Sequence, residues 1–227
     1  YRGKRVYYPI NKYLTKEGGN CVKWDFCNKT FFHPFFLAPL AIYKDSCKKD
    51  IICSNLPNNL RDYFETVHFE DIYDVSDLSS SNTLKEYLDK SYIPISRFTM
   101  LNSNVDKIEE VLQEIMEKQA KIDHNMRNPI SYFFSELVGN ISEHSESKYG
   151  YVFSQKVRKN LYVIIADSGK TIYGSYVDTH KYLSEIDGNE AKAMKIANDG
   201  YSTKDRPFAE SRGYGISKSR EMIVEGL

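Results

Sequence analysis

The segment from residue 129 to residue 144, PISYFFSELVGNISEH, constrains the fold of this chain more than any other. Its apolar side chains recur at the spacing i, i+3, i+4, i+7, which is typical of a helix that lies on a core. They are Ile130, Phe133, Phe134, Leu137, Val138 and Ile141. Asn128 is expected to be the N-cap of this helix, and Pro129 fits the first helical position.

A polar stripe borders the apolar stripe on the same helix. Its members are spaced four, three and one apart, so that they share one face over one to two turns. They are Glu136, Asn140, Glu143 and His144. These side chains are expected to lie at the rim of the core, where a pocket can form.

Two strand-like runs come after the helix, at residues 149–155 and 160–166. The second run is continuously apolar, which is typical of a strand that is covered on both faces. It ends in Asp167-Ser168-Gly169, and some forty residues later Arg212-Gly213-Tyr214-Gly215-Ile216 opens another helix. An amphipathic helix over residues 105–115, capped by one of the three residues before it, is expected to pack beside the 129–144 helix.

These motifs resemble the ATP-binding domain shared by gyrase, the heat-shock chaperone, histidine kinases and mismatch-repair MutL proteins, the GHKL or Bergerat-fold superfamily. The resemblance covers about residues 104–227. The family's helical Glu-x-x-x-Asn, often followed by an acid and a histidine, is matched by Glu136, Asn140, Glu143 and His144. Its Asp-x-Gly-x-Gly is matched by Asp167, Gly169 and, in place of the second glycine, Thr171. Its Gly-x-Gly at a helix start is matched by Gly213 and Gly215.

The resemblance implies binding of ATP with Mg²⁺. Asn140 would supply one oxygen ligand to Mg²⁺, which prefers hard oxygen ligands and keeps several waters. Glu136, one helical turn earlier, would orient or deprotonate the attacking water. Asp167 would accept a hydrogen bond from the adenine amino group, and Gly169 would let the backbone pass close to the ring.

The segment from residue 173 to residue 212 is expected to form a lid over the nucleotide, with a helix over residues 190–198 that ends near Gly200. The helix that begins near Gly215 would offer free N–H groups to the phosphates. The expected nucleotide-contacting residues of this region are Ser202, Thr203, Lys204, Arg212, Gly213, Tyr214, Gly215 and Ile216.

Residues 1–75 predict a small α/β unit with strands at 21–26 and 49–54 and helices at 31–43 and 58–66. This order predicts a parallel βαβ crossover. It is similar to STAS domains, the fold of bacterial anti-anti-sigma factors. Regulatory members of that family carry a phosphorylatable hydroxyl where the strand turns into the helix, whereas residues 32–35 here read Phe-His-Pro-Phe.

Composition narrows the function classes. Hydrophobic residues make up 41% and charged residues 27% of the chain, which favours a globular protein over a disordered one. Lys+Arg and Asp+Glu number 31 each, which argues against a general nucleic-acid binder. The sequence contains no run as apolar and as long as a membrane span, so no membrane partner is expected. The spacing of the four cysteines favours reduced thiols of a cytoplasmic protein over a zinc site.

The predicted fold class is α/β: a STAS-like domain at 1–75, a connection at 76–102, and a Bergerat-fold α/β sandwich with helices on a mixed sheet at 103–227. The family adds strands after the last helix, so either truncation or a small sheet is expected here. The predicted function is Mg²⁺-ATP binding that closes the lid and controls an unidentified protein partner, with slow ATP hydrolysis. A serine/threonine kinase like the anti-sigma factors and a non-enzymatic interaction module stay open, as does a homodimer.

Overall fold

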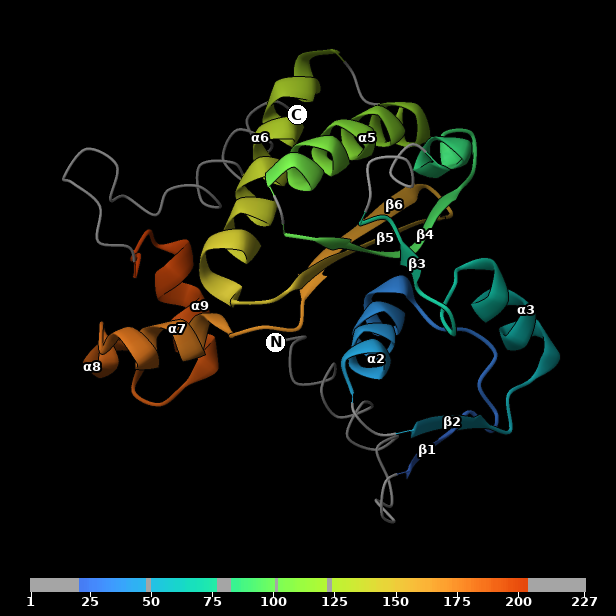
Figure 1. The fold of residues 1–227 in the computed structure, drawn as a ribbon, viewed down its shortest axis with the longest axis horizontal. Coiled ribbons are helices and arrows are strands. Elements are labelled where there is room, and N and C mark those ends of the chain that lie inside the picture. Colours follow the sequence, from blue (N-terminus) through green and yellow to red (C-terminus); the bar gives the residue numbers. More distant parts are fainter. Residues whose placement is uncertain (1–20, 48–49, 77–82, 101, 122–123, 204–227) are drawn as a thin grey trace. The chain divides into compact units, whose positions relative to one another are not determined.

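The computed structural model describes residues 21–47, 50–76, 83–100, 102–121 and 124–203, and this part of the chain is an α/β protein with two sheets (Figure 1). The expected α/β class is therefore confirmed. The chain divides into two compact units. The first contains the described residues up to Val75 together with Lys90–Arg97 and Tyr151–Ala166, and the second contains Ser76–Asp89, Phe98–Gly150 and the residues from Asp167 onward.

The first unit begins with the predicted alternation of strands and helices. Strand β1 (Cys21–Asp25) is followed by helix α2 (Pro34–Ser46), strand β2 (Asp50–Ser54) and helix α3 (Asn58–Thr66). β1 and β2 pair in parallel, with Val22 opposite Ile51 and Trp24 opposite Cys53. The predicted parallel βαβ crossover is confirmed.

Proline chemistry sets the start of α2. The helix begins at Pro34 rather than at residue 31, because a residue before proline disfavours the helical conformation and proline fits the first turn. His33 is the N-cap, and its Nδ1 accepts a hydrogen bond from the backbone N–H of Phe35 at 3.3 Å. Pro39 lies inside the helix, which continues to Ser46.

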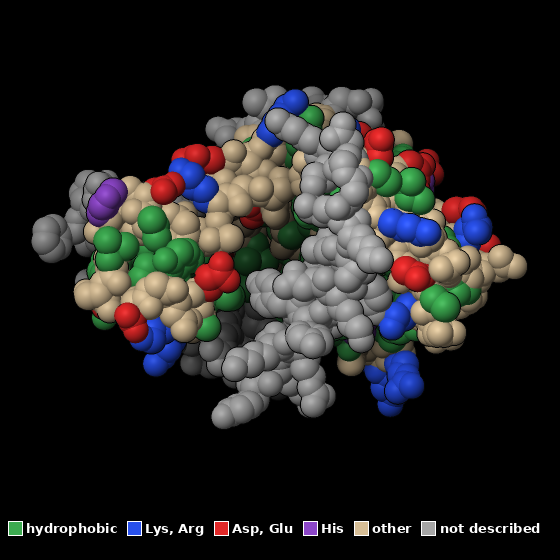
Figure 2. Space-filling model, turned by 90° about the horizontal axis from the view of Figure 1, so that it is seen from below, with side chains coloured by type: hydrophobic (Ala, Val, Ile, Leu, Met, Phe, Trp, Pro, Cys, Tyr) green, Lys and Arg blue, Asp and Glu red, His purple; other side chains and the backbone are tan. Residues whose placement is uncertain are grey.

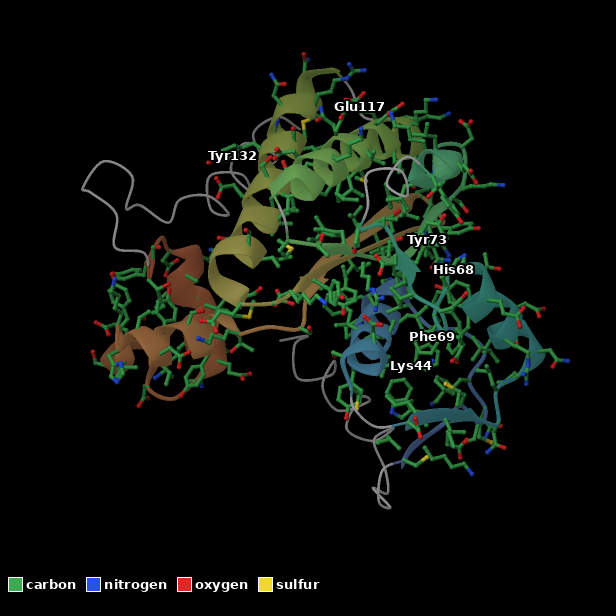
Figure 3. All side chains as sticks on the ribbon, viewed as in Figure 1. Lys44, His68, Phe69, Tyr73, Glu117 and Tyr132 are labelled. Carbon is green, nitrogen blue, oxygen red and sulfur yellow. The ribbon has the colours of Figure 1, made fainter. Side chains whose placement is uncertain are left out.

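An aromatic core joins these elements. The Phe64 ring of α3 lies 4.3 Å from Phe69 and 5.4 Å from Phe26 between ring centroids, and Phe69 lies 6.3 Å from Trp24. Ile95 and Phe153, from two later strands, belong to the same core. At the edge of this region Lys44 forms an ion pair with Glu70, and the rings of His68 and Tyr73 lie 5.4 Å apart (Figure 3).

The four-stranded sheet runs in the order β3-β4-β5-β6. Its strands are β3 (Tyr73–Asp74), β4 (Tyr92–Thr99), β5 (Tyr149–Val157) and β6 (Asn160–Asp167). β3 and β4 pair in parallel. β5 and β6 are joined by a two-residue turn, as antiparallel neighbours can be.

Two sequence predictions need correction in this sheet. β4 lies within the segment that was expected to connect two domains, and it pairs with β3 and β5 in the sheet. Burial of its side chains Ile93, Ile95 and Phe98 favours this pairing. β6 was expected to be covered on both faces. It ends the strand order of the described sheet, and its side chains after Asn160 are half-buried.

A charged network ties α2 to three strands of the first unit. The Arg97 guanidinium of β4 lies 2.8 Å from Asp45 of α2 and 2.8 Å from Asp74 of β3. The Tyr151 hydroxyl of β5 donates to the other Asp45 oxygen at 2.8 Å. Each Asp45 oxygen thus has a donor, which compensates for taking a carboxylate partly out of water.

The second unit contains the longer helices. α5 (Asn102–Ala120) and α6 (Arg127–Asn140) lie side by side, as predicted. Ser135 of α6 donates to Glu109 of α5 at 2.6 Å, and Arg127 pairs with Glu117 at 3.2 Å. α6 begins two residues before Pro129, and Met126 caps it without a side-chain hydrogen bond, so the prediction of Asn128 as the cap was wrong.

Short elements complete the second unit. They are the 3-10 turns η1 (Leu84–Tyr87) and η2 (His124–Met126) and the helices α7 (Ile172–Thr179), α8 (Leu183–Ile186) and α9 (Glu190–Asn198). The predicted helix at 190–198 is confirmed. A helix that could cross a bilayer is not found among the described residues. On the face drawn in Figure 2, Lys and Arg side chains lie among Asp and Glu side chains.

The aromatic core predicts a large effect at Phe64, whose side chain is 1% exposed. Phe64→Ala is expected to lower the free energy of unfolding by about 3–5 kcal/mol, because it leaves a cavity among four rings. Urea unfolding followed by fluorescence of Trp24, the single tryptophan, measures this core directly. The matched control is Phe35→Ala, which removes a ring that is 52% exposed and should cost less than about 1 kcal/mol. Equal losses in the two variants would contradict this account of the core.

Candidate functional site

Helix α6 places Glu136 and Asn140 one turn apart, and both side chains are half-buried. On the neighbouring face Phe134, Val138 and Ile141 are buried. The polar pair therefore borders the apolar side of the helix, as its spacing predicts. Tyr132 lies one turn before Glu136, and burial together with a hydrogen bond to the Glu136 carboxylate raises the pKa of its phenol. Figure 3 labels Tyr132 on this helix.

The helix does not continue regularly beyond Asn140. Residues Ile141–Ser145 form a π-helical turn, η3, which ends at Glu146 in a left-handed conformation with φ 54°. A π turn carries more residues per turn than an α-helix, so it changes the direction in which later side chains point. Glu143 and His144 lie in this turn. Their side chains lie outside the described part of the structure.

Ser145 ends the π turn and is 3% exposed. Its hydroxyl donates to the Ile141 carbonyl at 2.7 Å and accepts from the Ser147 N–H at 3.0 Å. The Ser145 carbonyl accepts a hydrogen bond from the Lys170 N–H at 2.6 Å. Ser145 thus connects the end of the α6 region to the turn after β6.

The turn after β6 approaches this carbonyl very closely at Gly169. A Cβ atom on residue 169 would lie 1.9 Å from the Ser145 oxygen and 2.7 Å from the Ser145 carbonyl carbon. Contacts this short do not occur, so glycine is required here for space. The first two predicted motifs, on α6 and after β6, therefore come together through the backbone.

Asp167 is half-buried at the end of β6. Burial raises the pKa of its carboxyl, and the hydrogen bond from the Gly169 N–H acts in the opposite direction. The Gly169 N–H donates to Oδ1 at 2.8 Å, which leaves Oδ2 lone pairs for a further donor. A desolvated carboxylate with acceptor capacity can select a ligand that carries an N–H donor.

Lys170 and Thr171 act within the protein. The Lys170 Nζ pairs with Glu146 and, at 2.6 Å, with Asp178 of α7. Thr171 stands where the motif has its second glycine, and the structure shows it as the N-cap of α7, accepting from the Gly174 N–H at 3.0 Å. Its hydroxyl is therefore engaged in capping, a role that its assignment to nucleotide binding did not include.

The described residues of the predicted lid belong to a cluster of three short helices. Tyr176 of α7, Ile186 of α8 and Ala193 of α9 form its core. The segment after α9 is attached to it, because the Lys181 Nζ donates to the Thr203 carbonyl at 2.9 Å. Ser202 precedes Thr203 in this segment, and both are half-buried. The other predicted contacts of this region lie outside the described residues: Lys204, Arg212, Gly213, Tyr214, Gly215 and Ile216.

Two residues of the site were missed by sequence reasoning. Ser145 carried one usable signal, since a serine four residues after a buried helical position can bond back to that carbonyl. Lys170 carried none, because its partners Glu146 and Asp178 are distant in sequence and become its neighbours only after folding.

The described residues contain no group of three or more His, Cys, Asp or Glu side chains that could hold a metal ion. Two hollows in the described part of the chain are lined by first-unit residues and not by Glu136, Asn140 or Asp167. The candidate site is instead defined by the Gly169–Ser145 contact, because this contact joins the residues that carry the chemistry.

Comparison with protein-family models, with curated proteins and with solved structures found no match to this chain.

The approach of Gly169 to Ser145 predicts opposite effects at two glycines. Gly169→Ala is expected to destabilise the second unit by about 1–3 kcal/mol, because its Cβ overpacks against backbone. Gly139→Ala is the matched control, since a Cβ on that residue of α6 meets nothing within 4 Å. It should stabilise the helix by about 0.5–1 kcal/mol. Thermal unfolding and hydrogen exchange at the Lys170 N–H measure both effects, and faster exchange only in Gly169→Ala is the expected result.

Proposed function

We propose that the chain is an ATP-binding regulatory protein in which a STAS-like unit accompanies a Bergerat-type ATP-binding unit. One observation carries the proposal: the turn at Asp167–Gly169 packs directly on the residue that ends the Glu136–Asn140 helix region. Two motifs that are weak when taken singly are thereby joined through the backbone, which supports a shared site.

The proposed adenine contact is Asp167. Its carboxylate retains acceptor capacity beside the Gly169 backbone, and its partial burial strengthens a hydrogen bond to an amino group. Adenine presents an amino group at the position where guanine presents a carbonyl. A carboxylate in this place therefore favours ATP over GTP. Gly169 is exposed on its other side, so a flat ring can lie against its backbone.

The proposed phosphate end of the site is the C-terminal part of α6. Asn140 would offer its amide oxygen to a phosphate-bound Mg²⁺, and Glu136 would orient the attacking water. The Glu136 carboxylate contributes to the raised pKa of the Tyr132 phenol, so the two side chains lie close together on this helix. Slow hydrolysis would then limit how long a protein partner meets the ATP-bound form.

The proposed lid is the α7–α9 cluster with the segment after it. Lys170 connects α7 to the loop after the π turn through its ion pairs with Asp178 and Glu146. A nucleotide that displaced or recruited this ammonium group would change how α7 is attached. That change supplies a route from ATP binding to a surface that a protein partner can recognise.

Kinase activity on the chain's own STAS-like unit is not supported. The position between β1 and α2 where regulatory STAS domains carry a hydroxyl is occupied by His33, which caps α2. The decisive experiment incubates purified protein with labelled ATP, with and without Mg²⁺, and monitors both phosphate release and protein labelling. Phosphate release without protein labelling is the expected result.

Asp167→Asn is expected to weaken ATP binding by about 1–3 kcal/mol, because the variant presents an amide where a carboxylate acceptor is needed. GTP should bind poorly to the parent protein. Without nucleotide the variant should be at least as stable as the parent at neutral pH. The pKa of Asp167 is raised in the folded state above its usual value of 3.8. Its protonated form therefore stabilises the fold below pH 3.8, and this stabilisation is lost as the pH rises through the folded-state pKa. Calorimetry that gave equal affinities for ATP and GTP would contradict the adenine assignment.

Substitutions of Glu136 and Asn140 are expected to have different effects on ATP binding and on hydrolysis. Asn140→Ala should weaken Mg²⁺-ATP binding and reduce turnover together, because it removes a Mg²⁺ ligand. Glu136→Ala should leave binding nearly intact and lower single-turnover hydrolysis by roughly 10²–10⁴-fold, the usual scale for a general base. Equilibrium binding and single-turnover rates measured on both variants test this. Equal losses of binding in the two would mean that the roles on α6 are misassigned.

A further inference from the structure

A hollow of about 470 Å³ lies in the first unit, between the start of α2 and the turn that joins β5 to β6. The described side chains that line it are Phe31, His33, Val157, Arg158, Asn160 and Tyr162. All of them belong to the first unit, so the hollow does not depend on how the two units are placed. Its volume suits a small organic molecule of one or two rings.

Three ring side chains shape one part of the hollow. The His33 and Tyr162 rings meet edge to face with centroids 4.3 Å apart. The Phe31 ring is 55% exposed, although most other phenylalanines of this unit are buried. Leaving a phenylalanine in water costs free energy that a flat ligand ring would recover by covering it.

Polar groups at the rim define the charge of the ligand. None of the described residues forms an ion pair with Arg158. His33 accepts the Phe35 N–H at Nδ1, which places its own proton on Nε2 as a neutral donor. The Asn160 amide lies 3.4 Å from the Tyr162 hydroxyl. One guanidinium with neutral donors beside it matches one carboxylate, which its fork can bind through two hydrogen bonds.

The backbone at Arg158 supplies an independent observation. Its φ is +58°, a left-handed conformation that glycine, asparagine and aspartate adopt more readily in hairpin turns. A two-residue hairpin turn calls for this conformation, which costs arginine free energy that glycine would not lose. Arg158 is therefore held by the hairpin in a defined place at the rim of the hollow.

We propose that this hollow binds a small planar aromatic carboxylate, with its ring against Phe31 and Tyr162 and its carboxylate on Arg158. The site is separate from the proposed ATP site, because it is built from different residues. Binding here would brace the start of α2 against the β5–β6 turn. The first unit would thereby have a small-molecule ligand of its own.

The test titrates the full chain with 2-naphthoate and monitors the fluorescence of the probe. Arg158→Gly is expected to weaken binding about 10-fold or more, because it removes a charged hydrogen-bonding partner. The same change suits the backbone conformation, so the thermal midpoint should stay the same or rise. Phe31→Ala, at an exposed ring, should weaken binding about 2- to 10-fold. Lys159→Ala, which alters the neighbouring cation of the turn, should leave the affinity unchanged.

Two further controls distinguish specific binding in the hollow from non-specific hydrophobic binding and from binding at the proposed ATP site. The uncharged analogue 2-naphthamide should bind more weakly than 2-naphthoate to the parent protein and equally to parent and Arg158→Gly. Asp167→Asn should leave 2-naphthoate binding unchanged. The absence of saturable 2-naphthoate binding, or equal binding to the parent and to the folded Arg158→Gly variant, would overturn the proposal.

Discussion

The contact between Gly169 and the Ser145 carbonyl fixes the geometry of the second unit. No side chain separates the two backbones, and the Lys170 N–H completes a hydrogen bond across them. The backbone at the end of the α6 region is thereby held in direct contact with the backbone that follows β6. This contact also positions the two residues that follow Gly169. Lys170 forms ion pairs with Glu146 and Asp178, and Thr171 is the N-cap of α7. The backbone around this contact is rigid, because moving either segment would break the hydrogen bond between the Lys170 N–H and the Ser145 carbonyl.

The first unit obeys a different constraint. Its described core mixes aromatic rings with aliphatic side chains, and charged residues lie where three strands and α2 meet at Arg97. Aromatic packing is tolerant of small shifts, whereas the guanidinium between Asp45 and Asp74 requires a defined geometry. The core therefore supplies the apolar burial, and the charged network adds contacts that hold only when β3, β4, β5 and α2 lie in this arrangement.

Periodicity predicted the elements whose pattern is regular. The strands at β1, β2, β5 and β6 and the helices at α2, α3, α5, α6 and α9 were expected from apolar spacing. β4 was missed because Pro94 and the polar stretch before it are typical of a connection. The apolar residues Ile93 and Ile95 are too few to predict a strand by themselves, and their burial is seen only in the folded structure. The π turn was missed as well, because the apolar spacing of residues 129–144 indicates no change of helical period. The candidate pair Glu136 and Asn140 could be predicted because one helix fixes their spacing, whereas Ser145 and Lys170 depend on tertiary contacts.

The Asp45 network also bears on the order in which the chain folds during synthesis. Asp45 meets Tyr151 across 106 positions of sequence, and Tyr63 meets Gln155 across 92. The first unit includes Tyr151–Ala166, so it cannot be completed when residue 75 leaves the ribosome. Its N-terminal part stays incomplete, with apolar surface exposed, while all of α5 and α6 is synthesised. Such long-range closure slows folding. This nascent stretch is therefore where a chaperone that recognises aromatic surface would act.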